Sequence, residues 1–221
     1  PACASDFRLL VRSAGLWQSA PMLTLPNLLT LSRILTVPLL VALLWPAEMG
    51  ARWTTGYTLA FALYCLMGIT DYFDGYLARA QGTVSKLGVF LDPIADKVLI
   101  TGAILGVLAS GSLPGIALPC GLILFREFAV SALRETMAGR IELPVTLAAK
   151  WKTTVQMVAL AALQLTLLWD AFGLQNEDGS PLSWQPAFES FAVFLIWFAA
   201  VITLWTGWQY FREARRQMQD L

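Results

Sequence analysis

Four aspartates in one short stretch are the residues whose type and spacing could do chemistry. They are Asp71, Asp74, Asp92 and Asp96, and long apolar runs flank them on both sides. Ionisable groups at membrane depth are costly and persist mainly where they have a function. Four neighbouring carboxylates would also repel one another, and would partly protonate unless cations neutralised them. The pattern therefore predicts a metal site.

Helical spacing divides the aspartates into two pairs. Asp71 and Asp74 are three residues apart, and Gly88, Asp92 and Asp96 follow one another at intervals of four. Residues at these intervals share a helix face, so two helices could each present two carboxylates to one centre. Carboxylate oxygens suit Mg²⁺ or Mn²⁺. Two such cations, about 3.5–4 Å apart, are typical of sites that displace a phosphoryl group.

The same stretch also allows simpler explanations. Ion pairing with Arg79, Lys86 and Lys97 at the membrane edge would explain some of the aspartates. Small residues in the stretch would serve either helix packing or the close approach of a ligand: Gly75, Ala78 and Gly88.

The elements that must position these residues are apolar helices. The chain has 221 residues, is 57% hydrophobic and 14% charged, and has a mean hydropathy of +0.62, which is too apolar for a soluble domain. Six segments approach the roughly 20 residues that cross a bilayer: 28–45, 53–72, 88–109, 113–133, 150–169 and 190–211. We therefore predict an all-α integral membrane protein with six transmembrane helices and a cytoplasm-facing polar cavity.

The composition also excludes several kinds of chemistry. Histidine is absent, so no histidine can act as a base, activate a nucleophile or bind metal. The three scattered cysteines fit no disulfide framework. The formal net charge is zero, which predicts no nucleic-acid partner.

Basic residues gather on one side of the six segments. With the N-terminus in the cytoplasm, only Arg52 among the basic residues flanks the opposite side, so both termini are expected to be cytoplasmic. We expect an N-terminal extension over 1–21 with a candidate interfacial helix, a six-helix domain over 22–215 and a tail over 216–221.

The aspartate stretch resembles the signature of the CDP-alcohol phosphotransferase family. It reads Asp71-x2-Asp74-Gly75-x2-Ala78-Arg79-x8-Gly88-x3-Asp92-x3-Asp96, with no departure from the family pattern. Members are integral membrane enzymes, usually dimeric, that move a substituted phosphate from a CDP-linked donor to an alcohol and release CMP. The resemblance implies the same activity, a homodimer and two divalent cations, Mg²⁺ or Mn²⁺.

The resemblance also implies roles for individual residues. Asp71, Asp74 and Asp92 would bind the metal pair, while Asp96 would share a metal and act as general base on the acceptor hydroxyl. The residues that would bind the CDP portion are Asp71, Gly75, Ala78, Arg79 and Gly88.

Four further segments resemble bacterial phosphatidylglycerophosphate synthases. They lie at 26–33, 92–97, 126–135 and 150–153. Such enzymes join CDP-diacylglycerol to glycerol 3-phosphate, so this resemblance implies these substrates and a bacterial inner membrane.

An anionic acceptor independently requires cationic donors beside the metals. The candidates for binding its phosphate are Arg126, Arg134, Lys150, Lys152 and Arg33. Candidate supporting residues are Asn27, Thr30, Glu127, Ser131 and Thr153. Positive-inside topology and attraction to anionic lipid headgroups offer an alternative explanation for the cations.

Three alternative functions stay open at this point. A cation transporter would also place carboxylates in the membrane, although the outer halves of the segments lack acidic residues to continue an ion path. A membrane scaffold would leave the four aspartates unexplained. The same transfer chemistry could also use another acceptor: phosphatidylglycerol, inositol phosphate or serine.

Overall fold

The described part of the chain is all-helical. A computed structural model describes residues 25–45, 54–81, 86–111, 113–137, 147–172, 174, 176, 178 and 180–219. Six helices occupy these ranges: α2 (Leu25–Leu44), α3 (Thr54–Gln81), α4 (Lys86–Ser110), α5 (Ala117–Met137), α6 (Leu147–Phe172) and α7 (Gln185–Gln219). The predicted all-α class is confirmed for these residues. The predicted N-terminal extension lies outside them.

Each predicted apolar segment overlaps one helix, but two helices extend well beyond the prediction. α3 continues from the predicted end at residue 72 to Gln81, and α7 continues from residue 211 to Gln219. Hydropathy marks only the apolar part of a helix, whereas backbone hydrogen bonding continues through polar residues as well. Because α3 extends past residue 72, Asp74 lies in the same helix as Asp71.

Proline marks the start of three helices. Pro26, Pro119 and Pro186 stand in the first turns of α2, α5 and α7. The first turn has no intrahelical partner for its N–H groups, so proline loses nothing there and its fixed φ favours the helix.

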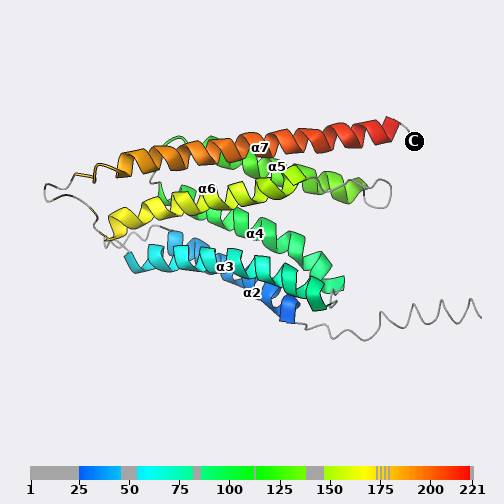
Figure 1. Cartoon of the computed structure of the whole chain (residues 1–221), viewed down its shortest axis with the longest axis horizontal. Coiled ribbons are helices and arrows are strands. Elements are labelled where there is room, and N and C mark those ends of the chain that lie inside the picture. Colours follow the sequence, from blue (N-terminus) through cyan, green and yellow to red (C-terminus); the bar gives the residue numbers. More distant parts are fainter. Residues whose placement is uncertain are drawn as a thin grey trace, which may run out of the picture.

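The helices form an elongated bundle in which α6 connects two groups. α2 packs against α3 and α4, α7 packs against α5 and α6, and α6 also packs against α3. Figure 1 shows the start of α2 and the end of α7 at the same end of the bundle. The end of α3, the start of α4, the end of α5 and the start of α6 lie at that end as well (Figure 1).

Two glycines allow α4 to approach α2 closely. A Cβ atom placed on Gly102 would lie 2.3 Å from Val37 Cγ1, and one on Gly106 would lie 2.5 Å from Leu44 Cδ1. Small residues four apart permit such contact between apolar helices. The packing fixes the register of α2 against α4, and with it the helix ends that carry polar residues.

Two helices have the length and apolarity needed to cross a membrane, among the residues the structure describes. Their apolar parts are Pro93–Ser110 and Gln185–Met218, and Leu28–Leu44 forms a shorter apolar helix. An integral membrane protein is consistent with these helices, and the number of six spans stays a prediction.

Candidate functional site

Side chains from three helices, α2, α3 and α4, meet in one cluster. Arg33 of α2 forms an ion pair with Asp71 of α3, and its Nη1 lies 3.9 Å from Oδ1 of Asp96 on α4. We call Arg33, Asp71 and Asp96 the aspartate cluster. The structure thus brings together one residue from each half of the aspartate motif, although 25 positions of sequence separate them.

Exposure differs sharply within the aspartate cluster. The Arg33 side chain is only 2% exposed, whereas those of Asp71 and Asp96 are 40% and 51% exposed. The two carboxylates therefore lie on the open side of a buried guanidinium group. Accessible carboxylate oxygens from two helices are the donor type that Mg²⁺ and Mn²⁺ prefer, so this part of the predicted ligand set fits a hard cation.

The remaining motif residues occupy the same two helices. Their side chains lie outside the described part of the structure, as do those of two other predicted site residues, Asn27 and Lys150. α3 contains Asp74, Gly75, Ala78 and Arg79; α4 contains Gly88 and Asp92; α2 contains Asn27 and α6 contains Lys150.

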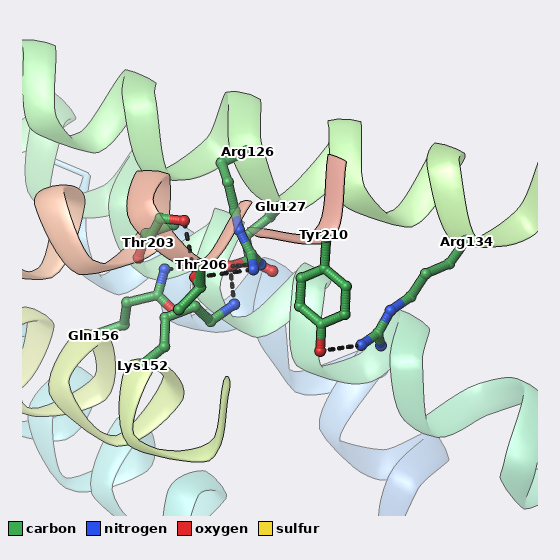
Figure 2. A network of polar contacts seen from close by, with 8 residues as sticks. All are labelled: Arg126, Glu127, Arg134, Lys152, Gln156, Thr203, Thr206 and Tyr210. Carbon is green, nitrogen blue, oxygen red and sulfur yellow. Dashed lines mark hydrogen bonds and ion pairs between the residues drawn. The ribbon is translucent and has the colours of Figure 1, made fainter. Parts of the chain in front are cut away.

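A second polar group joins α5, α6 and α7 (Figure 2). Glu127 Oε1 accepts hydrogen bonds from Lys152 Nζ, from Gln156 Nε2 at 3.3 Å and from Arg126 Nη1 at 3.4 Å. Two further contacts connect this group to α7, through Thr206 and Tyr210. We call the set the basic cluster: Arg126, Glu127, Arg134, Lys152, Gln156, Thr206 and Tyr210.

Most of the basic cluster is buried, although Arg134 at its edge is exposed, and the cluster carries surplus positive charge. The side chains of Arg126 and Lys152 are 7% and 8% exposed, and a single carboxylate, Glu127, forms ion pairs with both. Burying charge is costly unless it is paired, and among the residues whose side chains are described, these two buried cations share one carboxylate. An anionic ligand at this position would therefore be strongly favoured.

Two α7 residues of this cluster were not predicted from the sequence. Arg126 Nη2 donates to Thr206 Oγ1 at 3.1 Å, and Arg134 Nη2 donates to Tyr210 Oη at 2.6 Å. Both partners lie in an apolar helix with no motif around them. The available signal was the interval of four between Thr206 and Tyr210, which places two hydroxyls on one face of α7.

Three predicted supporting residues also lie near these clusters in sequence. Thr30 is buried in α2, one turn before Arg33. Ser131 in α5 and Thr153 in α6 are half-buried. Arg33, which was predicted to bind the acceptor phosphate with Arg126 and Lys152, forms ion pairs with Asp71 and Asp96, and its role in phosphate binding stays a prediction.

Comparison with known proteins shows where this arrangement belongs. The profile of the CDP-alcohol phosphatidyltransferase family matches residues 23–205. A protein of Cereibacter sphaeroides named CDP-diacylglycerol–glycerol-3-phosphate 3-phosphatidyltransferase is 38% identical, over 89% of this chain and 98% of its own length. Proteins with the same name are 37% identical in Rickettsia bellii, over 87% of this chain and 96% of theirs, and in Salmonella choleraesuis, over 89% and 97%. The family predicted from the aspartate motif is confirmed: the chain belongs to the CDP-alcohol phosphatidyltransferase family.

Proposed function

We propose that the chain transfers the phosphatidyl group of CDP-diacylglycerol to glycerol 3-phosphate, giving phosphatidylglycerophosphate and CMP. The observation that carries the choice of acceptor is the pair of buried cations in the basic cluster, Arg126 and Lys152, because the surplus positive charge there suits a second phosphate besides that of the donor. The names of the relatives, which match over nearly their whole length, support the same substrates.

The aspartates would form the donor side of the site. Asp71, Asp74, Asp92 and Asp96 would hold two divalent cations, Mg²⁺ or Mn²⁺, which when bound would neutralise charge on the pyrophosphate. The CDP portion would be held by motif residues from α3 and α4: Asp71, Gly75, Ala78, Arg79 and Gly88. Arg33 of α2 forms an ion pair with Asp71 and lies near Asp96, so we infer that it keeps the carboxylates of α3 and α4 together.

Asp96 would act as the general base. Its half-exposed carboxylate would accept the proton of the acceptor hydroxyl, whose oxygen attacks the phosphorus that bears the diacylglycerol. A new P–O bond forms while the bond from that phosphorus to the bridging oxygen breaks, and CMP leaves with the electron pair. The absence of histidine favours direct transfer, because no phosphohistidine intermediate can form.

The basic cluster would form the acceptor side of the site. Arg126, Arg134 and Lys152 would bind the phosphate of glycerol 3-phosphate together with Lys150, and Glu127 would keep two of these cations in place. Direct hydrogen bonds from two or more cations fix both the position and the orientation of a phosphate. Orientation matters because the acceptor hydroxyl must approach the phosphorus in line.

We infer a membrane arrangement that places both clusters together. Six transmembrane helices would surround a polar cavity open to the cytoplasm, with both chain ends on the cytoplasmic side of a bacterial inner membrane. The bundle supports this proposal, because α2 starts and α7 ends at the same end (Figure 1). The family resemblance further suggests a homodimer.

An activity assay with one acceptor at a time tests this function. The purified protein is supplied with labelled CDP-diacylglycerol, a divalent cation and one acceptor at a time: glycerol 3-phosphate, phosphatidylglycerol, inositol phosphate or serine. We expect labelled phosphatidylglycerophosphate and equimolar CMP with glycerol 3-phosphate alone. Preferential use of any other acceptor would overturn the substrate assignment while leaving the family intact.

A further inference from the structure

One face of α7 lies directly against the arginines of α5. Thr206, Gly207 and Tyr210 form this face, which we call the α7 cradle. Thr206 Oγ1 donates to the carbonyl of Thr203 at 3.0 Å and accepts from Arg126 Nη2 at 3.1 Å. The first bond uses the only proton of this hydroxyl, so a lone pair is left pointing towards the guanidinium group.

Gly207 provides the space that Arg126 occupies. A Cβ atom at this position would lie 2.8 Å from Arg126 Cγ, 3.2 Å from Nε and 3.6 Å from Cδ. Cγ is the middle of the side chain rather than its flexible end, and Arg126 is buried, so it could not simply swing into solvent. Any side chain at position 207 would therefore force Arg126 to move.

Tyr210 contacts two arginines at once. Its hydroxyl accepts the hydrogen bond from Arg134, and its ring lies 4.6 Å from the Arg134 guanidinium carbon and 5.8 Å from that of Arg126. Figure 2 shows the ring between the two side chains. A cation above an aromatic face is attracted to the ring, and the attraction is larger when the pair is buried.

We propose that the α7 cradle is a positioning element for the acceptor phosphate. Gly207 and Thr206 fix the course and the end of the Arg126 side chain, while Tyr210 sets the spacing between Arg126 and Arg134. None of the three residues contacts substrate under this proposal; each acts through an arginine. The proposal rests on the acceptor pocket described under the proposed function.

The decisive variant is Gly207→Ala. Alanine favours a helix more than glycine does, so α7 itself is not weakened. We expect the KM for glycerol 3-phosphate to rise about tenfold, with the KM for CDP-diacylglycerol within about twofold, as displacing one phosphate-binding arginine predicts. Gly121→Ala in α5 is the matched control, because a Cβ there meets nothing within 4 Å. Its KM values should match those of the unmodified protein.

A double-variant cycle separates positioning from general damage. Arg126→Ala removes Cγ, Cδ and Nε, the three atoms that crowd a Cβ at position 207. Gly207→Ala should then add less than about twofold to the KM of Arg126→Ala. An equal penalty in both backgrounds, or an unchanged KM for glycerol 3-phosphate in the single variant, would overturn the proposal.

Tyr210→Phe supplies a second, milder test. It keeps the ring but removes the hydroxyl that Arg134 uses, so the KM for glycerol 3-phosphate should rise roughly threefold with kcat preserved. Equal changes for both substrates would contradict a role in acceptor binding. If the unmodified protein uses no glycerol 3-phosphate, the proposed function fails; if it does and Gly207→Ala behaves normally, only this inference fails.

Discussion

The aspartate cluster and the basic cluster solve opposite electrostatic problems. In the aspartate cluster one buried arginine faces two half-exposed carboxylates, so negative charge remains open to solvent. In the basic cluster one carboxylate faces two buried cations, so positive charge remains inside the bundle. The first arrangement suits cations that arrive from water, and the second suits an anion that must be oriented.

The two clusters also differ in how they are held. Asp71 and Asp96 both form ion pairs with Arg33 of α2. α2 is in turn held against α4 by close contact at Gly102 and Gly106. The basic cluster is held by side-chain hydrogen bonds and ring contacts that come from α6 and α7. We therefore expect variants in the first cluster to change turnover and metal use, and variants in the second to change acceptor affinity.

The largest expected effect follows from Asp96→Asn. An amide cannot accept the proton of the acceptor hydroxyl, so turnover should fall about a thousandfold, within the usual range for removal of a general base. Release of CMP from labelled CDP-diacylglycerol measures it, and CDP-diacylglycerol binding should persist. Full activity in this variant would remove Asp96 from the role of base.

Asp178→Asn is the control for that experiment. Asp178 lies in the segment between α6 and α7, where the N–H and hydroxyl of Ser180 donate to it and lower the pKa of its carboxyl group. This fully exposed carboxylate is engaged locally and lies far from the chemistry in sequence. Its replacement should leave turnover unchanged.

The next largest effect is expected for Lys152→Gln. Removing one of the two buried cations paired with Glu127 lowers the surplus positive charge, so the KM for glycerol 3-phosphate should rise by about tenfold or more. The KM for CDP-diacylglycerol should stay within about twofold. Steady-state kinetics with each substrate varied in turn provides the measurement. Equal rises for both substrates would argue against separate donor and acceptor sides.

Many residues of the two clusters could be predicted from the sequence, because the signals that mark them lie in short stretches of the chain. Asp71 and Asp96 belong to one short motif whose helical spacing already places them on the faces of two adjacent helices. Arg126 and Lys152 were predicted because an anionic acceptor requires cationic donors beside the metals. Thr206, Gly207 and Tyr210 belong to no motif, and the interval of four between the two hydroxyl residues was the one signal, because their contacts form only when α7 packs against α5. The ion pairs of Arg33 with Asp71 and Asp96 were not predicted, since sequence does not show which partner a buried arginine meets.

A third variant, Glu127→Gln, should act on stability more than on chemistry. Arg126 and Lys152 would lose the carboxylate that both contact, and breaking such a buried ion pair costs about 3 kcal/mol. The Tm of the purified protein should fall, and inorganic phosphate should recover part of the loss by replacing the missing negative charge. A Tm loss that phosphate does not change would contradict an anion site.

The smallest effect is expected at the exposed end of α7. Arg212, Arg215 and Arg216 are exposed, and the sequence explains them by positive-inside topology alone. Replacing all three by glutamine should leave kcat and both KM values within about twofold. A selective rise in the KM for glycerol 3-phosphate would extend the acceptor side beyond the basic cluster.

A titration of Mg²⁺ against CMP release tests the division between the two clusters most directly. It compares the unmodified protein with Asp71→Asn and Lys152→Gln at saturating glycerol 3-phosphate. We predict that Asp71→Asn needs about tenfold more Mg²⁺ for half-maximal rate, as expected when one carboxylate ligand is lost, while Lys152→Gln needs the same amount as the unmodified protein. An unchanged requirement in Asp71→Asn, or CMP release that needs no divalent cation, would contradict it.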